Sequence, residues 1–344
     1  MSRRIFLLLY FVVAVCPAMS QAERFRVVCY NVENLYDTCH DDGFDDYEFL
    51  PHAERGWNTT RYWAKLGRIC RVLAAAGGDA PADVVGLCEV ENDTVVRDLC
   101  ERTRLCRLGY RYVVTKSADS RGLDVALLFQ PARFRLLKAE TFRPPFDEAY
   151  GRPTRDVLHA AGRLLTGDTL DIFLCHLPSR RGGTKAAARY RERVAAFIRR
   201  KADSLCSVRC HPAFLLMGDF NDESSDRSIT RGLAARPFDN GQVPDPMSLY
   251  VLSHRLRASD GIGGTYKYQG RWNQLDQMIV SGNLMSSAFS LHATSGSCRI
   301  FAPSFLTEPD AVHGGVKLRR TFLGPIYKGG YSDHLPLILD LFYR

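Results

Sequence analysis

The chain has 344 residues, of which 46% are hydrophobic and 24% are charged, values close to the average for globular proteins. This composition excludes collagen-like, coiled-coil and largely disordered proteins. The formal net charge of +8, from 46 Lys and Arg against 38 Asp and Glu, favours a polyanionic partner but does not indicate a fold.

The first residues have the pattern of an export signal. Two arginines precede an apolar run at residues 5–15, and small residues follow that run. The run is too short to span a bilayer core, which requires about 20 residues. We therefore predict a signal peptide at residues 1–22 and a secreted or periplasmic mature chain of residues 23–344.

Cysteine is frequent in the chain. Lipid anchoring at Cys16, within the predicted signal peptide, is the less favoured alternative, because the residue before it is larger than such sites usually carry. The remaining ten cysteines are an even number, which in an exported chain suggests disulfides. The favoured local pairs are Cys100 with Cys106 and Cys206 with Cys210.

Short apolar runs rich in β-branched and aromatic residues predict strands along the mature chain. They lie at residues 25–32, 83–90, 110–115, 123–129, 134–139, 157–165, 170–177, 213–218, 274–280 and 335–341. Apolar residues at helical spacing predict helices at residues 62–76, 92–105 and 184–204. Adjacent strands and strand–helix alternation both occur, which indicates mixed sheets with helices outside them. Because no linker or repeat divides the chain, we expect one large domain.

Several of these apolar runs end in, or lie next to, an acid, an amide or a histidine. The residues concerned are Asn31, Glu33, Glu89, His176, Asp219, Asn221, Asp276, Asp333 and His334. Burying ionisable groups is costly unless they pair with one another or bind a cation. A shared metal ion would therefore explain so many of them at strand ends.

The segments that carry these residues resemble, in chain order, the motifs of the endonuclease/exonuclease/phosphatase superfamily. They read CYNVEN at 29–34, LCEVEN at 87–92, GDFN at 218–221, QLD at 274–276 and SDH at 332–334. One such motif alone is a weak signal, whereas five in this order are a strong one. The resemblance covers residues 25–343. It implies a four-layer α/β sandwich of two mixed β-sheets flanked by helices, with the cleft at one edge.

The resemblance also implies a metal site. Glu89 corresponds to the principal metal carboxylate, with Asn31 and Asp333 nearby. Glu33 stands at a position where relatives have an acid that assists, and we assign Glu33 to substrate binding. Oxygen ligands of this kind suit Mg²⁺, or Mn²⁺ and Ca²⁺, better than zinc.

Five further residues correspond to catalytic positions of the superfamily. Asp219 would orient or deprotonate the attacking water, and Asn221 would hold the nucleophile or a phosphate oxygen. The resemblance pairs His334 with Asp276 to position the scissile phosphate. His176 would donate a proton to a phosphate oxygen or the leaving group, with a core histidine as its alternative. The general base stays open between Asp219 and His334.

Four arginines are candidates for substrate binding. Arg180 and Arg181 follow His176 beside a glycine turn, where paired guanidinium groups suit bidentate phosphate binding. Arg155 stands beside an acid at a strand start, and Arg320 lies in a segment that interleaves cations and aromatics. For Arg180, Arg181 and Arg320, a structural salt bridge is the competing interpretation.

These observations predict an exported, divalent-metal-dependent phosphodiesterase that hydrolyses phosphoester bonds by attack of water, with a nuclease favoured. The expected partner is a phosphate-bearing substrate, with nucleic acid as one candidate, and the expected oligomeric state is a monomer. A phosphomonoesterase or phospholipid diesterase of the same fold is one alternative. A non-catalytic surface binding protein is another.

Overall fold

The computed structural model describes residues 24–180, 184–238 and 242–344. The predicted signal peptide, Cys16 and Arg181 lie outside the described residues. Among the residues that are described, no helix is both long and apolar enough to cross a membrane.

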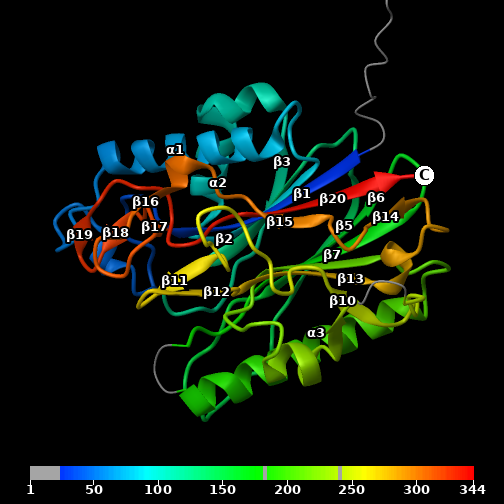
Figure 1. Ribbon diagram of the computed structural model, residues 1–344. Coiled ribbons are helices and arrows are strands. Elements are labelled where there is room, and N and C mark those ends of the chain that lie inside the picture. The colour runs from blue at the N-terminus through cyan, green and yellow to red at the C-terminus, as the bar shows by residue number, and fades with distance from the viewer. Residues whose placement is uncertain (1–23, 181–183, 239–241) are drawn as a thin grey trace, which may run out of the picture.

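Two seven-stranded sheets form the centre of the molecule (Figure 1). The first has the order β14 (Leu291–His292), β20 (Leu337–Tyr343), β1 (Arg24–Leu35), β2 (Val84–Val90), β4 (Asp124–Phe129) and β3 (Arg111–Val114), with β15 (Cys298–Ile300) also paired to β20. The second has the order β5 (Arg135–Phe142), β6 (Val157–Arg163), β7 (Thr169–His176), β8 (Phe214–Asp219), β13 (Asp276–Ser281), β10 (Leu249–Val251) and β9 (Ala235–Pro237). Both sheets mix parallel and antiparallel pairs, as β1 with β2 and β1 with β20 show.

Helices cover the outer faces of both sheets (Figure 1). α1 (Thr59–Gly77) and α2 (Asp93–Arg102) lie over the first sheet, and α3 (Thr184–Cys206) lies over the second. The sheets pack directly on each other: a Cβ built on Gly86 of β2 would lie 2.7 Å from Met217 and 2.8 Å from Leu174 of the second sheet. The predicted four-layer sandwich is therefore confirmed.

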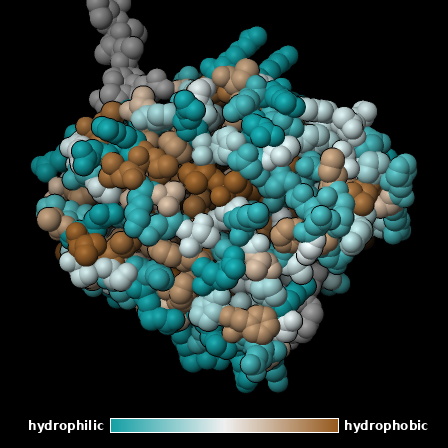
Figure 2. Space-filling model, turned by 180° about the vertical axis from the view of Figure 1, so that it is seen from behind, coloured by the Kyte–Doolittle hydropathy of each residue, from teal (hydrophilic) through white to brown (hydrophobic). Residues whose placement is uncertain are grey.

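The apolar faces of these layers form two cores. The larger lies between the sheets and beneath α1 and α2, and the smaller lies between the second sheet and α3. α3 contributes Tyr190, Val194 and Ile198 to the smaller core, at the helical spacing visible in the sequence. On the reverse face, hydrophobic residues gather in a patch that hydrophilic side chains surround (Figure 2).

Every predicted strand and helix occurs, with shifted ends. The helix predicted at residues 92–105 stops at Arg102, because Thr103 has an extended backbone and its hydroxyl oxygen accepts a hydrogen bond from the Leu105 N–H. A short 3₁₀ helix (Arg104–Leu108) follows.

Three small hairpins of two or three residues a strand were not predicted. They are β11 (Tyr266–Tyr268) with β12 (Arg271–Asn273), β16 (Thr307–Pro309) with β17 (Val316–Leu318), and β18 (Phe322–Leu323) with β19 (Ile326–Tyr327). Such short strands show no alternation that a sequence window can detect. They gather at one end of the sandwich (Figure 1).

The predicted disulfides are wrong in this structure. All ten cysteines of the described chain are free. Cys100 is buried on α2 whereas Cys106 is exposed in the 3₁₀ helix that follows, and Cys206 is half-buried whereas Cys210 is exposed. Proximity in sequence therefore does not bring these thiols together.

Candidate active site

The site forms where strands of both sheets end. His176 is the last residue of β7 and Asp219 the last of β8, and the two lie in register in a parallel pair. Asp276 begins β13 opposite Asp219. From the first sheet, Asn31 lies on β1 in register with Cys88, one residue before Glu89. Sheet edges of this kind bring the polar ends of several strands into one cleft.

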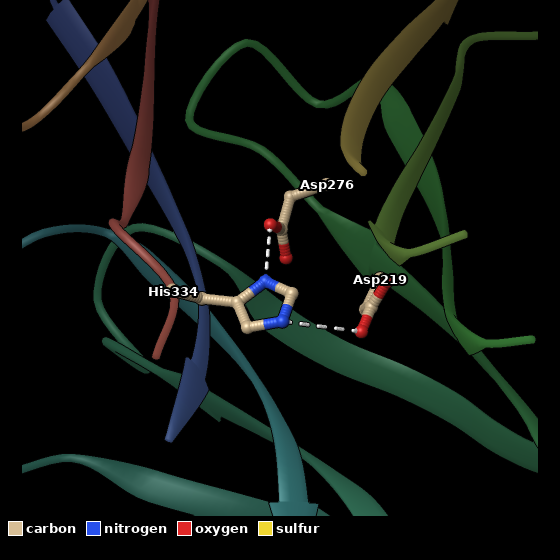
Figure 3. A group of neighbouring side chains, drawn as sticks. All are labelled: Asp219, Asp276 and His334. Carbon is tan, nitrogen blue, oxygen red and sulfur yellow. Dashed lines mark hydrogen bonds and ion pairs between the residues drawn. The ribbon is translucent and has the colours of Figure 1, made fainter. Parts of the chain in front are cut away.

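Three residues form a buried triad at this edge (Figure 3). The Nδ1 atom of His334 lies 2.7 Å from Oδ2 of Asp276, and its Nε2 atom lies 3.8 Å from Oδ2 of Asp219. Thr265 donates its hydroxyl proton to the same Asp276 oxygen at 2.5 Å. Asp276 is completely buried, and Tyr266 packs its ring against the imidazole of His334. The histidine is therefore fixed from three sides, with Nε2 directed at Asp219.

The triad shifts the acid–base equilibria of its members. Burial disfavours a charged imidazole, but the carboxylates of Asp276 and Asp219 outweigh it and hold the pKa of His334 well above its usual value. Burial raises the pKa of Asp219 to about 7, although His334 opposes this shift. At neutral pH the geometry thus favours a protonated His334 beside an Asp219 poised to exchange a proton.

His176 has the opposite electrostatic environment. Its Nε2 atom lies 3.6 Å from Oδ2 of Asp219 and 3.8 Å from Oε1 of Glu89, and it receives a hydrogen bond from the Arg155 guanidinium. Burial, Arg155 and Arg121 together hold the pKa of His176 well below its usual value. A neutral imidazole that accepts from Arg155 is a better hydrogen-bond acceptor than proton donor in this arrangement.

Asn31 and Glu89 complete the group around Asp219. The Asn31 amide donates to Oδ2 of Asp219 at 3.1 Å, and its own oxygen accepts from the Glu33 N–H at 2.9 Å. Glu89 accepts from the Asn34 N–H at 2.8 Å through Oε2, and its side chain is partly exposed.

The donor chemistry of the described residues fits a divalent cation. Oε1 of Glu89 and Oδ2 of Asp219 both lie within 4 Å of Nε2 of His176, at 3.8 Å and 3.6 Å. Carboxylate oxygens of this kind bind Mg²⁺, Mn²⁺ or Ca²⁺. Asp219, Asp276 and His334 also offer ligand atoms within 4.8 Å of one another, although the hydrogen bond between Asp276 and His334 already occupies one atom of each.

Several backbone conformations at the site are strained. Four non-glycine residues at the strand ends have positive φ: Glu33 (55°), Asn34 (51°), Glu89 (66°) and Asn221 (51°). Each such conformation costs about 1 kcal/mol or more and is typical of functional sites.

Gly218 permits a close approach next to Asp219. A Cβ at this position would lie 1.8 Å from the Cys175 carbonyl oxygen, and its φ of 139° excludes other residues. The glycine of the GDFN segment therefore allows β8 to lie against β7 where His176 and Asp219 meet.

Glu33 lies beside the site and is engaged elsewhere. It is buried, and its carboxylate accepts from the N–H groups of Thr321 at 2.6 Å and Phe322 at 3.2 Å. Burial and the charge of Asp333 raise its pKa to about 7, which Lys65 opposes. The structure thus places Glu33 as an anchor of the segment at residues 319–333.

Lys65 is a buried residue that the sequence reasoning missed. It projects from α1, is completely buried, and donates to the Tyr331 carbonyl oxygen at 2.6 Å and to the Thr321 hydroxyl. Burial lowers its pKa to about 8, although Glu33 opposes this. A lysine on the apolar stripe of a predicted helix is the signal that could have identified it.

Three other predicted residues have protein partners. Asp333 pairs with Arg320 at 2.8 Å, so one of its oxygens is already engaged. Arg320 also approaches Glu33 at 3.7 Å. Arg180 donates to the Asn221 carbonyl oxygen at 2.7 Å and to Asp226 at 3.0 Å.

The last two predicted residues are held inside the protein or at its strand ends. Arg155 is buried, 4% exposed, and held by Asp119 at 3.3 Å. Asn221 donates from its side-chain amide to the Leu177 carbonyl oxygen at 3.1 Å, and its N–H donates to Asp219 at 2.8 Å.

Comparison with known proteins supports the fold and identifies the family. The family model described as "Endonuclease/Exonuclease/phosphatase family" matches residues 26–342. A search of curated proteins finds no match.

Solved structures of similar fold include proteins of several activities. An endonuclease/exonuclease/phosphatase family protein from Bacteroides thetaiotaomicron has a TM-score of 0.57 and 16% identity, with 93% of this chain and 95% of that chain covered. TDP2 from D. rerio, humanized by 14 mutations, has a TM-score of 0.56 and 16% identity, with coverages of 92% and 98%. A mannosyl-6-phosphatase from B. thetaiotaomicron has a TM-score of 0.55 and 17% identity, with coverages of 92% and 99%. At such identities the likeness concerns the fold. Because the family model spans nearly all of the described chain, the protein belongs to the endonuclease/exonuclease/phosphatase family.

Proposed function

We propose that the protein is a divalent-metal-dependent phosphodiesterase that hydrolyses phosphoester bonds by attack of water, with nucleic acid as its substrate. The observation that supports this proposal is that three side chains from separate parts of the chain lie around the carboxylate of Asp219. Asp219 faces Asn31 at 3.1 Å, His176 at 3.6 Å and His334 at 3.8 Å, from separate strands and a loop.

A divalent ion at the Glu89 side of Asp219 would stabilise the negative charge that develops on the phosphate. Glu89, with Asn31 nearby, is the residue that we propose holds it. Mg²⁺ is the first candidate and Mn²⁺ or Ca²⁺ the alternatives, since all three prefer oxygen ligands.

The chain's own residues divide the remaining work. A protonated His334, oriented by Asp276, donates a hydrogen bond from Nε2 to a phosphate oxygen. Asp219, with a pKa near neutrality, accepts the proton of the attacking water. Neutral His176 lies beside Asp219 and accepts a hydrogen bond from Arg155, whose guanidinium adds positive charge near the phosphate.

The net charge of +8 supports a polyanionic substrate. The predicted signal peptide supports action outside the cytoplasm, which N-terminal sequencing of the mature protein would test: the chain should begin at Glu23.

The activity itself is tested by incubating the purified protein with DNA, RNA, a phospholipid diester and soluble phosphomonoesters, with Mg²⁺ and with EDTA. We expect cleavage of nucleic acid in Mg²⁺ and none in EDTA. Release of inorganic phosphate from monoesters alone would instead identify a phosphomonoesterase. Absence of turnover on every phosphoester would overturn the proposal.

A further inference from the structure

A cavity with a cationic lining lies beside the candidate active site. It has a volume of about 240 Å³ and lies between β17, the segment at residues 319–320 and the turn after β19. Four of its lining residues are cations, Lys317, Arg319, Arg320 and Lys328, against one acid, Glu308. We call this cavity the cationic pocket.

Much of its positive charge is not neutralised by the protein. Lys317 approaches Glu308 at 3.5 Å, but both side chains are more than 40% exposed, so water screens the pair. Arg319 and Lys328 are exposed, and within the described part of the chain neither forms an ion pair. A concave surface with unneutralised cations attracts anions.

The walls of the cationic pocket are held in place by buried contacts. Glu33 accepts from the N–H groups of Thr321 and Phe322, and Lys65 donates to the Tyr331 carbonyl oxygen. Gly330 packs so closely that a Cβ there would lie 2.1 Å from the Arg319 carbonyl oxygen. The pocket therefore requires little reorganisation to receive a ligand, which favours binding.

Arg320 connects the cationic pocket to the candidate active site. Its side chain lines the pocket, and its Nη2 atom lies 2.8 Å from Oδ2 of Asp333, the residue before His334. The cationic pocket and the candidate active site are thus linked through one ion pair, Arg320 with Asp333.

We infer that the cationic pocket binds a second phosphate group of the substrate, next to the one that is cleaved. The substrate class is then a molecule with at least two phosphates, and a nucleic acid backbone supplies them at regular spacing. Arginine and lysine are the side chains that bind phosphate most strongly. The inference rests on the proposed function, and it adds a substrate contact that lies outside the group formed by Asp219, Asp276 and His334.

The test compares substrates with one and with several phosphates. In the variant with Arg319→Glu and Lys328→Glu, we expect the ratio of kcat/KM for an oligonucleotide to that for bis(4-nitrophenyl) phosphate to fall at least about tenfold. Two fewer phosphate contacts should also reduce the slope of log KM against log salt by about 1 to 2. Arg189→Glu is the matched control, because Arg189 is exposed on α3, the helix that covers the second sheet. The ratio of kcat/KM values for this variant should stay within about twofold of the wild-type ratio.

Binding is measured separately, by the anisotropy of a labelled oligonucleotide in EDTA, where no turnover occurs. The double variant should bind at least about tenfold more weakly than the wild-type protein and the Arg189→Glu control. Neutral variants, Arg319→Gln with Lys328→Gln, give the same direction if charge reversal impairs folding. If the double variant keeps both the wild-type ratio of kcat/KM values and the wild-type affinity for the labelled oligonucleotide, the proposal that the cationic pocket binds phosphate is wrong. If no phosphoester is cleaved, the proposed function fails, while the anisotropy still decides whether the pocket binds phosphates.

Discussion

Nδ1 of His334 and Oδ2 of Asp276 lie 2.7 Å apart in a buried contact that orients the imidazole toward Asp219. A carboxylate in this position both fixes the orientation of the ring and stabilises its protonated form. Removing this carboxylate should therefore change both the rate and its dependence on pH.

Asp276→Asn keeps the shape of this contact and removes its charge. Because Asp276 raises the pKa of His334, the variant should lose the imidazolium at lower pH. We expect kcat to fall by about 10²-fold or more, and the alkaline limb of the pH–rate profile to move toward lower pH. The control is Asp203→Asn on the exposed end of α3, whose profile should match the wild-type one. A variant that loses rate with an unshifted alkaline limb would contradict the role of the charge.

Asp219→Asn tests the general base. Burial raises the pKa of Asp219 to about 7, so the carboxylate must lose its proton to act, and activity should decline as the pH falls through that range. The variant should lose about 10²- to 10⁴-fold in kcat together with the acidic limb. His334→Ala, compared in the same buffers, should retain the acidic limb. If only His334→Ala loses it, His334 is the base.

Glu89→Gln tests the metal site. EDTA should abolish the activity of the wild-type protein and Mg²⁺ should restore it, whereas the variant should require a Mg²⁺ concentration at least about tenfold higher. Isothermal titration with Mn²⁺ gives a readout independent of turnover. Glu48→Gln, an exposed acid near Arg55, is the control and should leave the titration unchanged. Equal metal affinity in wild type and Glu89→Gln would exclude Glu89 as a ligand.

Gly218→Ala tests the close approach of β7 and β8. The added Cβ would meet the Cys175 carbonyl oxygen at 1.8 Å, at a φ of 139°. We expect a loss of at least about 3 kcal/mol in the free energy of unfolding, measured by urea denaturation. Gly67→Ala on α1, with nothing within 4 Å of the new Cβ, should instead gain about 0.5–1 kcal/mol. Equal stability of the two variants would contradict the steric argument.

The sequence predicted the fold and named most of the residues that the structure brings together at the candidate site, but not the contacts that each of them makes. Asp219, Asp276 and His334 were identifiable because each follows or begins an apolar run. Glu33 and Arg155 stand in equally suggestive positions, yet one anchors a loop and the other is buried against His176. Contacts with residues far away in the chain decide such roles, and no local pattern reports them.

Sequence alone therefore determined the class of architecture, through hydrophobic periodicity, and the candidate residues, through strand-end polarity and the motifs that resemble the superfamily, because all of these are local properties of the chain. Only the tertiary structure decided that the pKa of His334 is raised and that of His176 is lowered, since burial and neighbouring charges set those pKa values. It also decided that the cations before Ser332 line a pocket fixed by Lys65 and Glu33. The sequence shows that Lys and Arg outnumber Asp and Glu, but only the folded chain shows where these cations gather.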